Sequence, residues 1–156
     1  MAKNFSIKIN GLDELIRNAN KVGGDFPNRM RNAMTQSTTL IQNEARRTGQ
    51  GRFKNQTGTL RRSIQKRVDG AERGVVFTDE KYAPYVEFGT RPHTITPKTG
   101  KMLAFKVGGK MVFARKVNHP GSKPYPYMTP AFEESTPKVQ DIYAKLGAEV
   151  VKELAK

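Results

Sequence analysis

The segment from Lys81 to His93 constrains the fold most, because it combines three aromatics, two prolines, one glycine and one carboxylate. Its aromatics recur at helical spacing, which predicts a single turn with three rings on one face: Tyr82, Tyr85 and Phe88. Pro84 fits the first turn of a helix, and Gly89 stands where a left-handed cap would end it. Arg91 precedes a proline, so the chain is expected to leave this turn in an extended direction.

Two interpretations of this aromatic turn stay open. Tyr82 and Phe88 fit a satellite core cluster under a loop, which is the interpretation favoured for these two rings. Tyr, Phe and Arg together are also typical of the anchors of a protein interface, which favours a contact surface. We expect Glu87 to be buried or half-buried, and to pair with Arg91 or with a base of a neighbouring subunit.

A chain of 156 residues with 36% hydrophobic residues and a mean hydropathy of −0.67 suffices for one domain with a modest core. We therefore expect a single domain over 1–156, with mobile loops at about 48–57 and 117–126. The chain has no cysteine and two histidines, so disulfides are excluded and neither a zinc site nor any other cofactor is expected. No membrane-spanning run or export leader is recognised.

Basic residues are concentrated in the middle of the chain, whose formal net charge is +14. Residues 28–67 hold ten Lys and Arg and one acid, Glu44, whereas 131–156 hold four bases and five acids. The run considered as a site is Arg46, Arg47, Arg52, Lys54, Arg61, Arg62, Lys66 and Arg67. A solvated charged face, a DNA-facing lining and a surface for an acidic protein partner all stay open.

Hydrophobic periodicity predicts the order of the elements. We expect strands at 5–9, 75–77, 102–107 and 110–115, helices at 12–22, 27–47 and 139–154, and loops at 48–56, 94–101 and 117–126. Residues 60–68 fit either a strand or a helix, and the strand is favoured. Thr129 is expected to cap a short helix, and Thr136-Pro137 to start a separate one. The sum is an α+β fold: a small, mostly antiparallel sheet packed against a long N-terminal helix and a C-terminal helix.

Three segments in order resemble one protein family. They are Tyr-Ala-Pro-Tyr-Val-Glu-Phe-Gly-Thr at 82–90, Thr-Gly-Thr-Leu-Arg-Arg-Ser-Ile at 57–64, and Pro-Tyr-Pro-Tyr-Met-Thr-Pro-Ala-Phe at 124–132. Together they are similar to the tail-completion or head–tail joining proteins of tailed bacteriophages, although Tyr127-Met128 replaces the usual Phe-Leu. The resemblance implies a virion protein made in the host bacterial cytoplasm, without catalysis. It also implies a homo-oligomeric ring that docks on a connector, adaptor or tail-tube protein and lets double-stranded DNA pass without sequence preference.

Two alternatives are a free basic nucleic-acid-binding protein and a small nuclease or hydrolase. The second would use His93 and His119 as an acid/base pair, but neither lies near a nucleophile in the sequence. Residues 97–102 faintly match a phosphate loop, and a basic turn is the better interpretation.

Overall fold

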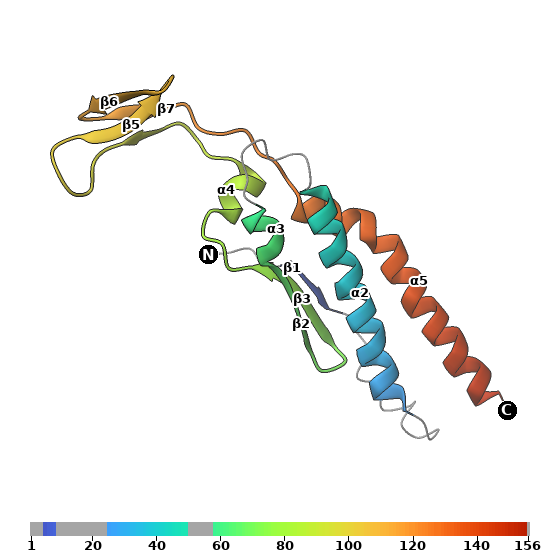
Figure 1. Cartoon of the computed structure of the whole chain (residues 1–156). Helices are drawn as coiled ribbons and strands as arrows, with labels where there is room; N and C mark the ends of the chain where they lie inside the picture. The colour runs from blue at the N-terminus through green and yellow to red at the C-terminus, as the bar shows by residue number, and fades with distance from the viewer. Residues whose placement is uncertain (1–4, 9–24, 50–57, 156) are drawn as a thin grey trace.

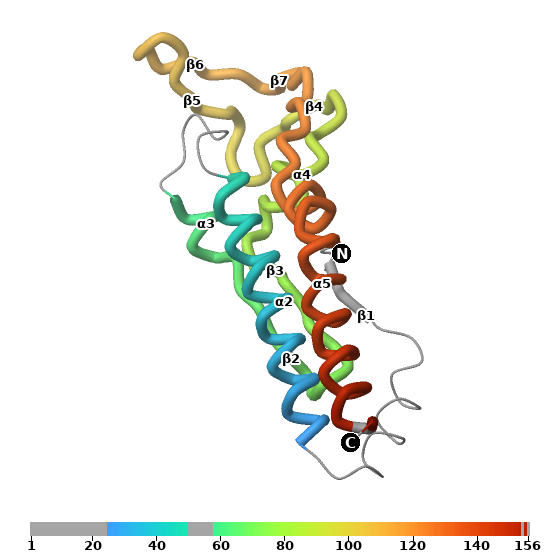
Figure 2. The backbone as a smooth tube through the Cα atoms, turned by 90° about the vertical axis from the view of Figure 1, so that its right-hand side faces the viewer, coloured from blue at the N-terminus to red at the C-terminus, as the bar shows by residue number. Residues whose placement is uncertain are grey.

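Two long helices lie side by side in the computed structural model, which describes residues 5–8, 25–49 and 58–155, and the first of them packs on a small antiparallel sheet (Figures 1 and 2). The helices are α2 (Phe26–Thr48) and α5 (Met128–Leu154). Strand β3 (Arg73–Thr78) lies between β1 (Phe5–Lys8) and β2 (Ile64–Asp69), and both pairings are antiparallel. This architecture confirms the predicted α+β class with its two flanking helices.

Helix α2 forms the centre of the body because its apolar residues recur on one face. Met30, Met34, Ile41 and Ala45 are all buried, as the periodicity predicted. The helix packs on β2, β3 and α5. Gly74 allows β3 to approach α2 closely, since a Cβ there would lie 2.4 Å from Cγ2 of Thr38.

Helix α5 is one continuous helix of 27 residues, so the prediction of two helices meeting at Thr136-Pro137 is wrong. Pro137 lies inside the helix with its ring exposed, where it removes one backbone hydrogen bond but leaves the packing intact. The expected cap role of Thr129 is also wrong, because the helix already begins at Met128. The first turns pack into the main core through buried residues: Tyr127, Met128, Ala131 and Val139.

The segment 58–69 is half helix and half strand, which corrects the favoured interpretation of one long strand. Gly58, with a φ of +72°, precedes the short helix α3 (Thr59–Ser63), and β2 follows it directly. Both halves reach the same core, because Leu60 and Ile64 are both buried in it. The four-residue spacing of these two side chains explains why the sequence fitted either structure.

A β-arm extends from the end of the body opposite the C-terminus (Figure 1). It consists of β4 (His93–Ile95) paired with β7 (Val117–His119), and β5 (Leu103–Val107) paired with β6 (Lys110–Ala114). The expected hairpin around Gly108 and Gly109 is confirmed, and both glycines have positive φ. The loop predictions at 94–101 and 117–126 are wrong at 94–95 and 117–119, because polar three-residue strands carry no apolar alternation.

Some expectations concern residues outside the described ranges. These expectations are the helix at 12–22, Ile9 of the first strand, residues 50–57 of the loop at about 48–57, and two basic candidates, Arg52 and Lys54. Within the described ranges, none of the helices combines the length and apolarity needed to cross a lipid bilayer.

Candidate functional site

The aromatic turn forms helix α4 (Ala83–Phe88) and presents its rings outward. Tyr82 occupies the N-cap position, and Gly89, with a φ of +69°, ends the helix. Tyr85 is 61% exposed, Phe88 50% and Tyr82 38%. The favoured core interpretation of Tyr82 and Phe88 is therefore wrong, and the exposure of the rings is what a contact surface requires.

The opposite face of α4 is buried and carries Glu87, which is only 4% exposed. Its Oε2 accepts hydrogen bonds from the backbone N–H groups of Tyr127 (2.7 Å) and Met128 (3.0 Å), and its Oε1 accepts one from Thr129 (2.8 Å). The first N–H groups of a helix have no partner within the helix, and a negative charge there is also favoured by the helix dipole. Glu87 thus caps α5 from another part of the chain, so its expected pairing with Arg91 or with a neighbouring subunit's base is wrong.

A second set of backbone contacts joins α4 to the segment before α5. Thr90 and Ser122 exchange two backbone hydrogen bonds of 3.0 and 3.1 Å, and the N–H of Tyr125 donates to the carbonyl oxygen of Val86 at 2.8 Å. Gly121 has a φ of +87°, and a Cβ there would lie 2.2 Å from the carbonyl oxygen of Thr90. The three exposed tyrosines, Tyr82, Tyr85 and Tyr125, consequently stand on one doubly anchored support.

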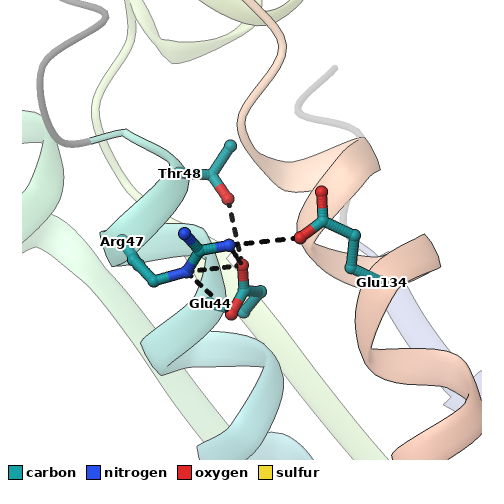
Figure 3. A network of polar contacts seen from close by, with 4 residues as sticks. All are labelled: Glu44, Arg47, Thr48 and Glu134. Atoms are coloured by element: carbon teal, nitrogen blue, oxygen red, sulfur yellow. Dashed lines mark hydrogen bonds and ion pairs between the residues drawn. The ribbon is translucent and has the colours of Figure 1, made fainter.

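The basic candidates at the end of α2 are engaged by other groups of the chain. Arg47 forms ion pairs with Glu44 and, at 3.3 Å, with Glu134 of α5 (Figure 3). The hydrogen bond from Arg47 lowers the pKa of the Glu44 carboxyl. Arg46 donates at 2.7 Å to the carbonyl oxygen of Ile64. These two arginines therefore tie α2 to α5 and to β2, which the acid-poor sequence around them did not indicate.

The structure brings four of the basic candidates together around one open groove of about 410 Å³. Its lining consists of Asn43, Arg46, Arg47, Arg61 and Arg62. Arg61 and Arg62 are exposed on α3. The remaining described members of the run lie on β2, where Lys66 contacts the hydroxyl of Thr39 and Arg67 pairs with Asp69 at 3.2 Å. A single anion bound in the groove would therefore contact only some residues of the basic run, because Lys66 and Arg67 lie outside the groove.

The two histidines do come together, since His93 and His119 are register partners of β4 and β7, with ring centroids 5.1 Å apart. The Nδ1 of His93 lies 2.8 Å from the carbonyl oxygen of Arg91, and that of His119 accepts from the N–H of Gly121 at 3.0 Å. The sequence contains no carboxylate between Glu87 and Glu133 that could orient either ring. Within the described residues, no group of three His, Cys, Asp or Glu side chains could hold a metal ion.

The β-arm carries a charge that the sequence-based predictions did not include. Eight Lys and Arg residues and no acid lie between Glu87 and Glu133: Arg91, Lys98, Lys101, Lys106, Lys110, Arg115, Lys116 and Lys123. This segment is as acid-free as the run at 45–68. It also includes the arm's exposed large apolar side chains, so its charge and hydrophobicity taken together could have indicated a surface: Ile95, Met102, Val107, Met111, Val112 and Phe113.

Comparison with known proteins supports the resemblance read from the motifs. Residues 13–89 match the model of the HK97-gp10-like family, described as "Bacteriophage HK97-gp10, putative tail-component". The match covers just under half of the 156 residues and ends at Gly89, so it includes the aromatic turn and the segment at 57–64. No curated protein and no solved structure matches the chain. The recognition of a phage tail component is thereby confirmed for this part of the chain.

Proposed function

We propose that this chain, whose first half is similar to a phage tail component, is a structural subunit of the virion. It closes with further copies of itself into a ring at the head–tail junction or the tail end. The ring docks on a connector, adaptor or tail-tube protein and lets double-stranded DNA pass. The reaction is assembly, and no covalent step is required.

The observation that carries the proposal is the aromatic turn at 82–88, which is anchored to the core on one side and exposes its aromatic rings on the other. The Glu87 carboxylate on its buried side accepts hydrogen bonds from three backbone N–H groups, while Tyr85 remains 61% exposed. Exposed rings on a rigid support lose little conformational entropy when a partner covers them. In a closed ring each subunit uses two different surfaces, so a defect in either one stops assembly.

Assembly of phage particles tests the proposal. Tyr85→Ala combined with Arg91→Ala removes an exposed ring and an exposed cation, both of them outside the core. We expect separate heads and tails in electron micrographs of the variant lysate. Val151→Ala with Lys152→Ala is the matched control, because it removes one exposed apolar and one exposed basic side chain at the far end of α5. Joined particles at the yield of the unmodified phage from the Tyr85/Arg91 variant would refute the contact role.

The groove around Arg61 and Arg62 favours free nucleic-acid binding as a second candidate function. An isolated monomer acting in this way would bind duplex DNA without sequence preference, with an affinity that falls steeply with salt. Replacing Arg61 and Arg62 by Ala would then reduce the slope of log Kd against log salt by about one unit per residue. A monomer with only weak, unchanged binding would favour the ring, in which DNA contact depends on assembly.

A further inference from the structure

The β5–β6 hairpin exposes apolar side chains on a face that no other described element covers. Cross-strand register places Ala104 opposite Phe113 and Lys106 opposite Met111. These four side chains share one face of the ribbon, because side chains alternate along a strand, and all four are exposed, with Phe113 at 60%. We call this set the open face of the hairpin.

The open face is incomplete without a partner. Among the described elements, β5 and β6 have their extensive contacts only with each other. An isolated two-stranded ribbon is marginally stable in water, and an exposed Phe–Met pair gains free energy when it is covered. The rest of the arm adds cations and no acids, which sets the chemistry of a partner: apolar or aromatic, with carboxylates beside it.

The chain itself carries such a surface at α4. Tyr82, Tyr85 and Tyr125 are exposed there, and Asp79 and Glu80 lie a few residues before the helix, separated from it by Lys81 and Tyr82. Glu80 lies close enough to Tyr82 to contribute, after burial, to the raised pKa of its hydroxyl. Aromatic side chains with nearby carboxylates complement a face of Phe and Met flanked by lysines.

We infer that the open face of the hairpin of one copy docks on the tyrosine surface of α4 in the next copy. The inference rests on the proposed ring and names its subunit contact. The two surfaces are different parts of one chain, so the contact is heterologous and repeats around a ring. Lys106 of the open face meets the carboxylates of Asp79 and Glu80. In this arrangement the β-arm of one copy extends onto the α4 surface of the neighbouring copy.

Site-directed cross-linking tests this docking, and the chain is well suited to it because it contains no cysteine. Ala104, on the open face, and Lys81, beside Tyr82, are exposed positions where a cysteine leaves Phe113, Met111 and the three tyrosines in place. Full-length Ala104→Cys and Lys81→Cys chains are mixed and treated with a short bismaleimide, which tolerates more variation in distance than a disulfide does. We expect the mixed dimer to exceed the dimer of a control pair, Ala104→Cys with Val151→Cys, by about tenfold or more. A docked contact holds the two thiols at millimolar effective concentration, whereas free chains meet at micromolar concentration. A chain that carries both Ala104→Cys and Lys81→Cys should give a ladder of oligomers.

An amine-reactive cross-linker applied to the unmodified chain separates failure of this inference from failure of the ring. Amine-linked oligomers without an excess of the dimer between Ala104→Cys and Lys81→Cys chains would overturn the docking and leave the ring in place. If neither cross-linker gives oligomers at the protein concentration found in assembling particles, the docking and the ring are both overturned. A cross-link that forms only without duplex DNA, together with DNA protection of Ala104→Cys from maleimide, would assign the open face to nucleic acid instead.

Discussion

Replacing Glu87 tests the claim that a single carboxylate joins the aromatic turn to α5. Glu87→Ala leaves the N–H groups of Tyr127, Met128 and Thr129 without their acceptor, and the first two of these residues are buried. Each buried group that loses its partner costs about 1–3 kcal/mol, and removal of a charge from the helix terminus adds a few tenths or more. Relief from burying a carboxylate offsets part of this sum. We expect a net loss of about 3–5 kcal/mol in the free energy of unfolding, out of a total of about 5–15 kcal/mol for a typical domain.

Urea unfolding followed by circular dichroism at several temperatures measures this loss. For a chain of this length the expected loss lowers Tm by roughly 6–20 °C. Glu87→Gln keeps one acceptor oxygen, so its loss should be intermediate. Glu72→Ala removes an exposed carboxylate from the β2–β3 turn and should change stability by about 0.5 kcal/mol or less. A Glu87→Ala protein within about 1 kcal/mol of the unmodified chain would refute the capping role.

Further predictions concern the second anchor, the alkaline limb of stability, and assembly. Gly121→Ala should lower the free energy of unfolding more than Gly109→Ala does, because both glycines have positive φ but only at Gly121 would a Cβ meet backbone, 2.2 Å from the carbonyl oxygen of Thr90. We expect a loss of about 1–2 kcal/mol for Gly109→Ala from backbone conformation alone and a larger loss for Gly121→Ala, both measured from urea midpoints. Burial raises the pKa of Tyr127 well above its usual range, with a smaller contribution from Glu87. Above about pH 10 the hydroxyl of Tyr127 therefore stays protonated in the folded chain but ionises in the unfolded chain, so its contribution to stability is complete below about pH 10 and falls as the pH rises further. Tyr127→Phe should reduce the decrease in the free energy of unfolding between about pH 9 and pH 11, and an unchanged slope would contradict the role of Tyr127. In phage particles, the paired Tyr85 and Arg91 variant should leave heads and tails separate while the Val151 and Lys152 control joins them.

The sequence predicted the parts of the fold in which a period matches a buried face. Helix α2 and strand β3 are of this kind, because their apolar residues lie against the core at the expected spacing. The hairpin at 103–114 was found through its two glycines, although neither of its faces is fully buried. In each case a local signal, period or turn, was enough.

The start of α5 could not be predicted locally, because its cap is a side chain 40 residues earlier in the chain. The structure places Tyr127 at the N-cap, where its side chain makes no capping hydrogen bond, and Glu87 supplies the acceptors. The same separation hid the role of Glu87, which the sequence placed correctly as buried but with the wrong partner. Strands β4 and β7 escaped prediction for a related reason, since their pairing depends on register between distant polar segments.

The candidate site divides in the same way. The aromatic turn was recognised from its residues, but its orientation follows from which side of α4 carries Ala83 and Glu87, and these are the buried side chains. For the basic run, the charge is evident from the residues, but the groups that contact it are not. Glu134 of α5 and the carbonyl oxygen of Ile64 engage Arg47 and Arg46, and only the fold brings them there.

A reconstruction of the head–tail junction and tail of the intact virion by electron cryomicroscopy tests the central claim most directly. We expect several copies of this chain in one closed oligomeric ring, with the aromatic side chain of Tyr85 covered at the boundary between neighbouring copies. A virion without the chain, or one in which it stands as a single copy with Tyr85 facing solvent, would contradict it.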